Sequence, residues 1–249
     1  SSDLPSRPAS RVNAARPSST SLDTAAAQAA FLAAMQERAA YAALHDVQEP
    51  IRLIETHVSW VFLTGRYAYK IKKPLRLSFL DYSTPERRAA LCAEELRLNQ
   101  RYAPELYVAV VPIGGTPSSP RVGSRDDVFE HALRMVQFDP SQELGQLLLH
   151  GAVNPEELRT FGSELAGMHA HAERAPRDAD YGAPARTHRV TLANFDEIGR
   201  VHGAERAADS RRHDAFVQAR LDVIHAHVES SYERLQALME QRRVAGRVR

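Results

Sequence analysis

Residues 51–74 read IRLIETHVSWVFLTGRYAYKIKKP, and two neighbouring β-strands can be recognised in this run. Apolar side chains alternate along residues 58–63 with the two-residue period of a strand. Gly65 and Arg66 then form a two-residue hairpin turn with glycine in the first position. The partner strand is expected over Tyr67 to Lys72. The segment therefore predicts a β-hairpin.

All three lysines of the chain, Lys70, Lys72 and Lys73, lie within four residues at the end of this hairpin. The other 29 basic side chains are arginines. Lysine is a compact point charge on a flexible stem, which suits it to reach a phosphate in a tight cleft. The alternative is that the lysines lie on a solvated strand edge, where they oppose aggregation.

Alternation along the second strand places Ala68, Lys70 and Lys72 on one face and the residues between them on the other. A small residue two positions before a lysine lets an adenine ring lie flat over Ala68 while the ammonium of Lys70 reaches the phosphates. Protein kinases use such an Ala-x-Lys strand, with the lysine paired to a glutamate on a helix. The pattern therefore predicts a nucleotide site on this face.

A helix that could supply the glutamate follows the hairpin. Thr84 is its expected cap and Pro85 its first residue, and the helix stops before Pro104. It carries two adjacent acidic residues, Glu94 and Glu95, either of which could pair with the lysine. Helical spacing does not choose between them, and we favour Glu95.

Composition limits the class of protein. The chain has 249 residues, of which 43% are hydrophobic, and a net charge of +1, which argues against a broad nucleic-acid interface. No apolar run approaches the roughly 20 residues of a membrane span, and no secretory signal precedes the first helix. We therefore expect a cytoplasmic protein. The single cysteine, Cys92, excludes an internal disulfide and is expected to be a buried structural thiol.

The remaining sequence divides into a mostly β half with one inserted helix and an all-helical half. Residues 1–22, rich in Ser, Pro, Arg and Ala, are expected to form a disordered tail. The further elements expected are a helix over 23–44, strands over 106–113 and 131–138 with a loop over 114–123 between them, a helix from Asn154-Pro155, a polar stretch over 175–187 and a final helix over 212–243.

Two features of the helical half have alternative interpretations. The final helix has apolar residues near heptad spacing, which indicates either ordinary core packing or a coiled coil that binds a partner. His169 and His171 look like metal ligands, but residues two apart on a helix point about 200° from each other. We therefore expect no metal site in the chain.

Four segments resemble bacterial aminoglycoside phosphotransferase-like proteins. They are residues 51–74, FLDYST at 79–84, EELRLN at 94–99 and PELYVAVVPI at 104–113. The resemblance covers about residues 45–249 and is strongest between 51 and 113. It is closest to a subgroup of predicted kinases in which this domain precedes a P-loop kinase-like domain, which would be a downstream partner in the full-length protein.

The resemblance implies an α+β, protein-kinase-like fold of two lobes. Residues 23–136 would form an N-terminal helix and the small lobe, an antiparallel sheet with one helix, and residues 137–249 part of a helical large lobe. It also implies ATP with magnesium, and phosphoryl transfer to a small hydroxyl-bearing acceptor. The residues implied in nucleotide binding are Ala68, Lys70 for the phosphates, Glu95 to orient Lys70, and a hinge at Met135, Val136, Gln137 and Phe138.

The chain departs from the family pattern in two places. The segment from Glu55 to Ser59, where protein kinases have a glycine-rich loop, contains no glycine. The family's His-Gly-Asp catalytic loop and magnesium-binding Asp do not occur, and the Mg ligands are expected beyond Arg249. We therefore expect no catalytic residue in this chain, weak nucleotide binding at best and no turnover. The alternative is a non-catalytic pseudokinase or partner-binding scaffold module.

Overall fold

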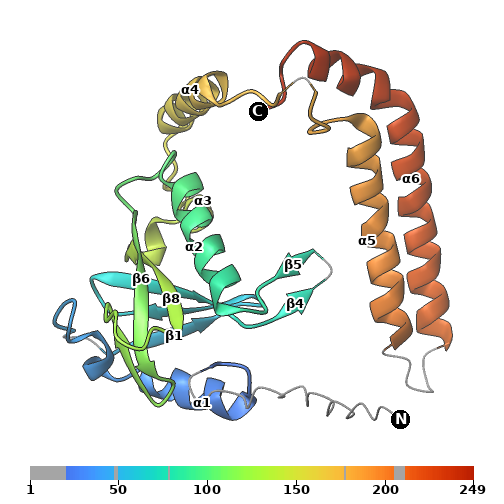
Figure 1. Cartoon of the computed structure of the whole chain (residues 1–249). Helices are drawn as coiled ribbons and strands as arrows, with labels where there is room; N and C mark the ends of the chain where they lie inside the picture. The colour runs from blue at the N-terminus through green and yellow to red at the C-terminus, as the bar shows by residue number, and fades with distance from the viewer. Residues whose placement is uncertain (1–20, 48–49, 78, 177, 205–210) are drawn as a thin grey trace, which may run out of the picture. The chain divides into compact units, whose positions relative to one another are not determined.

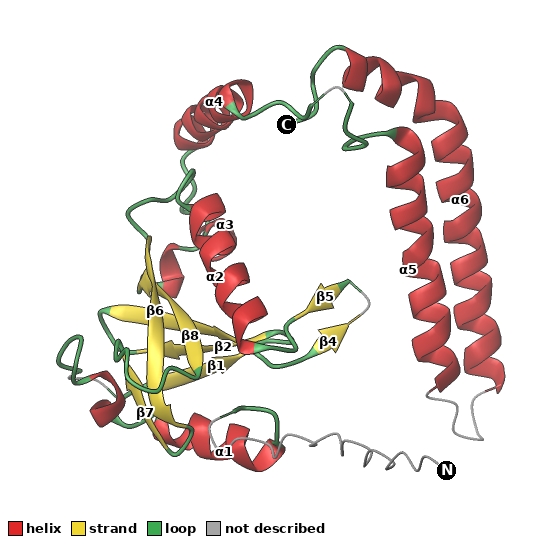
Figure 2. Ribbon diagram, in the orientation of Figure 1, coloured by secondary structure: helices red, strands yellow, loops and turns green. Residues whose placement is uncertain are grey.

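A computed structural model describes residues 21–47, 50–77, 79–176, 178–204 and 211–249 (Figure 1). The chain divides into two compact units, Ser1–Gln142 and Glu143–Arg249. The first combines a β-sheet with helices, and the described part of the second contains helices and connecting segments (Figure 2). The chain is therefore of the α+β class, with a mostly β half followed by a helical half.

In the part of the chain that the structure describes, six antiparallel strands form the main sheet, in the order β1-β2-β3-β8-β6-β7. Their bounds are Arg52–Glu55 (β1), Ser59–Leu63 (β2), Tyr67–Lys72 (β3), Tyr107–Thr116 (β6), Ser119–Val122 (β7) and Glu130–Val136 (β8). Strands β4 (Arg76–Leu77) and β5 (Leu80–Asp81) pair in a separate ribbon. The predicted hairpin is confirmed, and Gly65 at its turn has a φ of 87°.

Helix α1 (Ala25–Ala34) and the 3₁₀ turn η1 (Arg38–Tyr41) close one face of the sheet. Phe31 of α1 lies at the centre of this core, with its ring 6.2 Å from Trp60 and 5.9 Å from Phe129, measured between ring centroids. Edge-to-face and tilted contacts at such distances are favoured by the charge distribution of aromatic rings. The helix, the sheet and the loop before β8 therefore share one aromatic core.

The single helix expected over residues 23–44 is interrupted after Ala34. Met35 is fully buried at the break, and the hydroxyl of Tyr41 donates a 2.9 Å hydrogen bond to the Met35 carbonyl. A tighter 3₁₀ turn then brings Tyr41 itself into the core. Burial of these two side chains, rather than the helical preference of the alanines, decides the path of the chain here.

Helix α2 (Pro85–Asn99) begins as the sequence predicts. The Thr84 hydroxyl accepts a hydrogen bond from the Arg87 amide, and Pro85 occupies the first turn, where its missing amide hydrogen costs nothing. This helix contacts β6 and β8 and lies on the sheet face opposite to α1 (Figure 2). It is the element that brings glutamates over the lysine-bearing strand.

The prediction of a loop over residues 114–123 is wrong for most of that segment. Gly114 and Gly115 continue β6, and Ser119–Val122 returns as β7 to pair with it. Glycine, proline and serine normally indicate a loop, but β7 is the edge strand of the sheet, where a proline is tolerated. A hairpin therefore replaces the expected loop.

The second unit contains α3 (Leu144–Leu149), α4 (Pro155–His171), α5 (Pro184–Ala204) and α6 (Arg211–Val244). The expected start of α4 at Asn154-Pro155 is confirmed, and the final helix extends one residue beyond its expected bounds at each end. Helix α5 was not predicted, and it begins inside the stretch expected to be polar and irregular. Helices α5 and α6 pack against each other as an antiparallel pair (Figure 1).

Most of the expected tail lies outside the part of the chain that the structure describes. Residues 1–20 of the tail lie outside the described residues. Leu22, which the composition assigned to the tail, is fully buried in the core of the first unit. Among the helices that the structure describes, none combines the length and apolarity needed to cross a membrane.

Candidate functional site

The sheet face beneath α2 carries a row of small and aliphatic side chains beside the lysines. Directly opposed residues of antiparallel strands point to the same face. The strand register opposes Leu63 of β2 to Ala68, and Ala68 to Met135 of β8. Two residues further along β3, Lys70 lies between Val61 of β2 and Leu133 of β8. Apolar side chains of three strands therefore lie next to a positive charge on this face, and Ala68 and Leu133 among them are buried.

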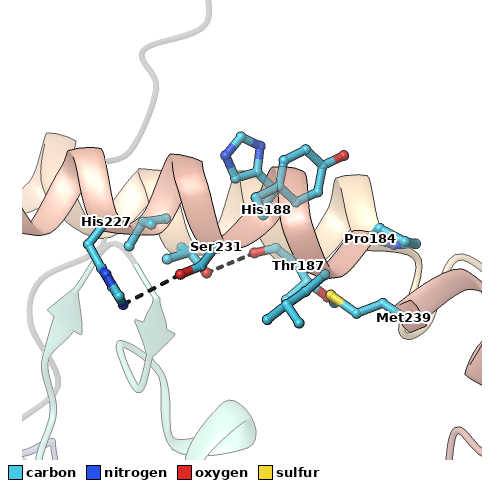
Figure 3. A pocket seen from close by; sticks show the side chains of 10 residues that line it. Pro184, Thr187, His188, His227, Ser231 and Met239 are labelled. Carbon is cyan, nitrogen blue, oxygen red and sulfur yellow. Dashed lines mark hydrogen bonds between the residues drawn. The ribbon is translucent and has the colours of Figure 1, made fainter. Parts of the chain in front are cut away.

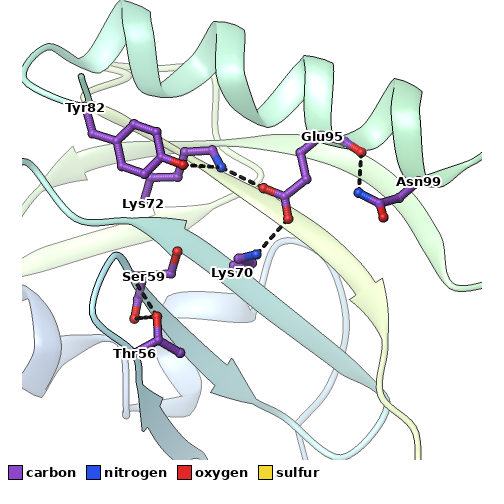
Figure 4. Close-up of polar contacts among 7 residues, drawn as sticks. All are labelled: Thr56, Ser59, Lys70, Lys72, Tyr82, Glu95 and Asn99. Carbon is purple, nitrogen blue, oxygen red and sulfur yellow. Dashed lines mark hydrogen bonds and ion pairs between the residues drawn. The ribbon is translucent and has the colours of Figure 1, made fainter. Parts of the chain in front are cut away.

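Glu95 of α2 binds two lysines of β3 at once (Figure 4). The ammonium nitrogen of Lys70 lies 2.7 Å from Glu95 Oε1, and that of Lys72 lies 2.6 Å from Glu95 Oε2. Each carboxylate oxygen therefore has its own cationic partner. Charge-assisted hydrogen bonds of this length are stronger than neutral ones and fix the position of the carboxylate.

Glu94, the alternative partner left open by helical spacing, points away from the lysines. Its carboxylate accepts hydrogen bonds from Arg97 at 2.6 and 2.8 Å on the exposed side of α2. The side-chain amide of Asn99 donates to the backbone carbonyl of Glu95 at 2.8 Å (Figure 4). The rotation of α2 about its axis therefore selects Glu95, in agreement with the expectation.

Lys72 has a second partner, Tyr82, which the sequence pattern did not predict. Its ammonium lies 3.3 Å from the hydroxyl of Tyr82 and 4.9 Å from the centre of that ring. Burial by itself would lower the pKa of Lys72, but the hydrogen bond and the charge of Glu95 outweigh burial and raise it above the ordinary value. Lys72 is therefore a charged group inside the protein at neutral pH.

The pKa of Glu95 responds to the same contacts in the opposite sense. Burial would raise the pKa of this carboxyl, but the hydrogen bonds from Lys70 and Lys72, together with their charges, hold it below its usual range. Glu95 is therefore ionised at neutral pH. Two ammonium groups and one carboxylate leave the cluster with one net positive charge.

The turn between β1 and β2 lies at the Lys72 end of the hairpin. Thr56 closes it, because its hydroxyl donates to the Ser59 carbonyl at 3.0 Å and accepts from the Ser59 amide at 3.0 Å (Figure 4). Ser59 is opposed to Lys72 in the sheet, and its buried hydroxyl has no hydrogen-bond partner among the described residues. This turn is ordered by a threonine side chain in place of glycines.

The four residues expected to form a hinge run along the end of β8 and just beyond it. The Val136 amide donates to the Leu106 carbonyl at 2.8 Å, and the Gln137 amide donates to the Arg66 carbonyl at 3.0 Å. The Gln137 side chain also accepts from the Gly65 amide at 3.0 Å. These two backbone amides are therefore engaged within the protein, whereas the Phe138 side chain is exposed.

The sequence pattern predicted that Ala68, Lys70, Glu95 and Met135 lie together, and the structure brings all four to one face of the sheet. It missed Leu63 as the neighbour of Ala68 and Val61 as the neighbour of Lys70, although both alternate with Trp60 and Phe62. It also missed Tyr82. The order of residues in the chain contains no signal that this tyrosine folds back onto the lysines.

A separate groove of about 230 Å³ lies along α5 and α6 in the second unit (Figure 3). His188 stacks on Tyr232 across the two helices, with ring centroids 3.9 Å apart, and its Nε2 lies 3.1 Å from Glu229 Oε1. The groove wall is otherwise mostly Thr, Val, Leu and Met. No cluster of three or more metal-ligating side chains occurs among the residues that the structure describes.

Comparison with known proteins gives sequence relatives of unknown role. The chain is 30% identical over 144 residues to an uncharacterized protein of Mycobacterium bovis and equally to uncharacterized proteins of two Mycobacterium tuberculosis strains. The match covers 57% of this chain but only 27% of each relative, so the chain matches about a quarter of their length. No protein-family model matches the chain, and no solved structure matches it.

Proposed function

We propose that the first unit is the nucleotide-binding lobe of an ATP-dependent small-molecule phosphotransferase of the aminoglycoside phosphotransferase-like class, with a protein-kinase-like fold. The observation that carries this proposal is the 2.7 Å pair between Lys70 and Glu95, two residues along β3 from the small side chain of Ala68. Phosphoryl-transfer enzymes of the kinase type use a strand lysine held by a helix glutamate to bind nucleotide phosphates.

The surroundings of the pair suit a nucleotide. The apolar row formed by Leu63, Ala68 and Met135 would carry the adenine ring, and the net positive charge beside it would carry the phosphates. Since the amides of Val136 and Gln137 are engaged, the adenine would use the backbone of Phe138 and carbonyl oxygens of this segment. The turn at Thr56 would lie near the phosphates in the role of the glycine-rich loop.

We do not expect these 249 residues alone to catalyse phosphoryl transfer. Orientation of the acceptor hydroxyl requires an aspartate, and the magnesium ions require further ligands. No His-Gly-Asp sequence occurs in the chain. We therefore propose that the chain binds Mg-ATP without transferring its phosphate, and that the acceptor is a small hydroxyl-bearing molecule. Turnover abolished by Lys70→Ala would contradict this.

Isothermal titration calorimetry with Mg-ATP and with adenosine tests the nucleotide site. Loss of a hydrogen bond to a charged group costs about 1.5–3 kcal/mol, so Lys70→Met should weaken Mg-ATP binding by roughly 10- to 100-fold. Adenosine has no phosphates, and its affinity should not change. Lys73→Met is the matched control, because Lys73 pairs with Glu55 away from Glu95.

Two results would contradict the proposal. One is the absence of binding at millimolar Mg-ATP, and the other is equal Mg-ATP affinity of the wild-type protein and Lys70→Met. Either result would favour a second candidate, a partner-binding scaffold. The observation behind this alternative is that α6 exposes Ile224, Leu235 and Leu238 along one helix.

A further inference from the structure

The two lysines that share Glu95 differ in how firmly they are held. The Lys72 side chain is 4% exposed, whereas that of Lys70 is 31% exposed. Lys72 also has the Tyr82 hydroxyl at 3.3 Å as a second partner and the Tyr82 ring beneath its ammonium. Among the residues that the structure describes, the ammonium of Lys70 makes its hydrogen bond with Glu95 alone.

Moving Lys72 away from Glu95 would leave a buried ammonium without its counter-charge. An unpaired charge inside a protein is strongly unfavourable, so Lys72 and Glu95 are bound to stay together. Lys70 is different, because its side chain is 31% exposed and its ammonium has further N–H donors besides the one that Glu95 engages. Of the two lysines, Lys70 is the one that an incoming phosphate can recruit.

The carboxylate also limits what Lys70 can do. If Lys70 were the only partner of Glu95, sharing the charge of Lys70 with a phosphate would leave a partly buried carboxylate poorly compensated beside an anion. Lys72 removes this penalty, because it continues to neutralise Glu95 through the 2.6 Å contact with Oε2. The charge of Lys72 therefore balances Glu95 when Lys70 also contacts a phosphate.

We propose that Lys72 is a positioning residue that holds and neutralises Glu95, so that Lys70 can bind the phosphate oxygens of a nucleotide while it stays in place beside the carboxylate. This inference rests on the proposed function and assigns to Lys72 a role that the Ala-x-Lys pattern did not suggest. Glu95 then binds both lysines, of which Lys72 stays fixed and Lys70 also contacts the nucleotide.

The chain has only three lysines, which makes a direct experiment possible. Acetylation of side-chain amines with acetic anhydride, followed by mass spectrometry, reports the accessibility of each lysine. Without nucleotide, Lys70 should react faster than Lys72. With saturating Mg-ATP, the rate at Lys70 should fall at least about threefold, while Lys72 stays slow and the rate at Lys73 is unchanged.

A variant separates positioning from a merely structural role. In Lys72→Met, Glu95 keeps only Lys70, so Mg-ATP should bind about tenfold more weakly, while the affinity for adenosine stays the same. A general disturbance of the fold would weaken both ligands alike, and Lys73→Met should change neither. If Lys72→Met does not fold, acetylation of the wild-type protein decides the question.

The outcomes distinguish this inference from the function on which it rests. If calorimetry detects Mg-ATP binding but Lys70 is not protected, or Lys72 changes instead, the division of roles is wrong and the nucleotide site stands. If Lys72→Met weakens adenosine and Mg-ATP equally, Lys72 is structural. If no Mg-ATP binds at all, both the proposed function and this inference fail.

Discussion

Arg88 of α2 and Glu130 of β8 form an ion pair in which both side chains are fully buried. The Arg88 Nη2 atom lies 2.7 Å from Glu130 Oε2, and Arg88 Nε lies 2.8 Å from the same oxygen. Arg88 Nη1 also donates to the Tyr82 carbonyl at 2.8 Å. The pair fixes α2 on the sheet two turns before Glu95 and, through Tyr82, adjoins the lysine cluster.

Removing one member of this pair should be costly. Arg88→Met leaves the Glu130 carboxyl buried without its cationic partner, and we expect a loss of about 3–5 kcal/mol in the free energy of unfolding. Urea denaturation followed by the fluorescence of Trp60, the only tryptophan, measures it. The double variant Arg88→Met/Glu130→Met should recover most of the loss, since it buries no charge.

The exposed pair between Glu94 and Arg97 on the same helix is the matched control for this experiment. Surface ion pairs contribute little, so Glu94→Gln should leave the stability almost unchanged. Equal effects of Arg88→Met and Glu94→Gln would contradict the distinction between buried and exposed pairs.

The stability of the first unit should depend on Glu95 at acid pH. Its pKa is lower in the folded protein than in the unfolded chain, so its contribution is full above the unfolded pKa and is lost as the pH falls through the folded value. Thermal unfolding between about pH 5 and pH 3 should therefore be steeper with pH in the wild-type protein than in Glu95→Gln. Parallel curves for the two proteins would refute this contribution.

The contribution of Lys72 to stability depends on pH in the opposite direction, because Lys72 is a base. Its pKa is raised in the folded protein, so the stabilisation is present below the unfolded pKa and is lost as the pH rises through the folded value. The loss should begin above about pH 10.5 and should be smaller in Lys72→Met, as melting curves at high pH would show.

Cys92 should be unreactive in the folded protein. It belongs to α2 and its side chain is buried, and burial raises the pKa of the thiol to about 11, so the nucleophilic thiolate is scarce and shielded. We expect Ellman's reagent to label Cys92 slowly without denaturant and rapidly in unfolding urea. Fast labelling of the folded protein would show that α2 opens away from the sheet.

Gly115 should resist replacement because of its backbone. Its φ is +90°, and an added Cβ would lie 2.5 Å from the Ser119 carbonyl across the β6–β7 hairpin. Gly115→Ala should therefore destabilise the first unit by at least about 1 kcal/mol, as measured through Trp60 in urea. Ser118→Ala, at an exposed position of the same turn, is the control and should have almost no effect.

Local features of the sequence were sufficient for several elements. The alternation around Gly65 predicted the β2–β3 hairpin, and Thr84-Pro85 and Asn154-Pro155 predicted two helix starts. Each depends on interactions between residues close in the chain, which are readable without knowledge of the fold. The α+β class followed from the order of these elements.

Other elements depended on contacts between distant residues. The edge position of β7 turned an expected loop into a strand, and burial of Met35 and Tyr41 ended α1 early. Helix α5 was missed because its composition is polar and its packing partner α6 follows later in the chain. In these cases tertiary contacts outweighed local preference.

The sequence by itself determined the residue types of the candidate site and the face that holds Ala68, Lys70 and Lys72, because alternation along a strand is a property of its backbone. Only the tertiary structure decided that Glu95 rather than Glu94 meets the lysines and that Tyr82 supports Lys72. The rotation of α2 and the return of the chain at Tyr82 are set by packing across the sheet, which no local spacing encodes.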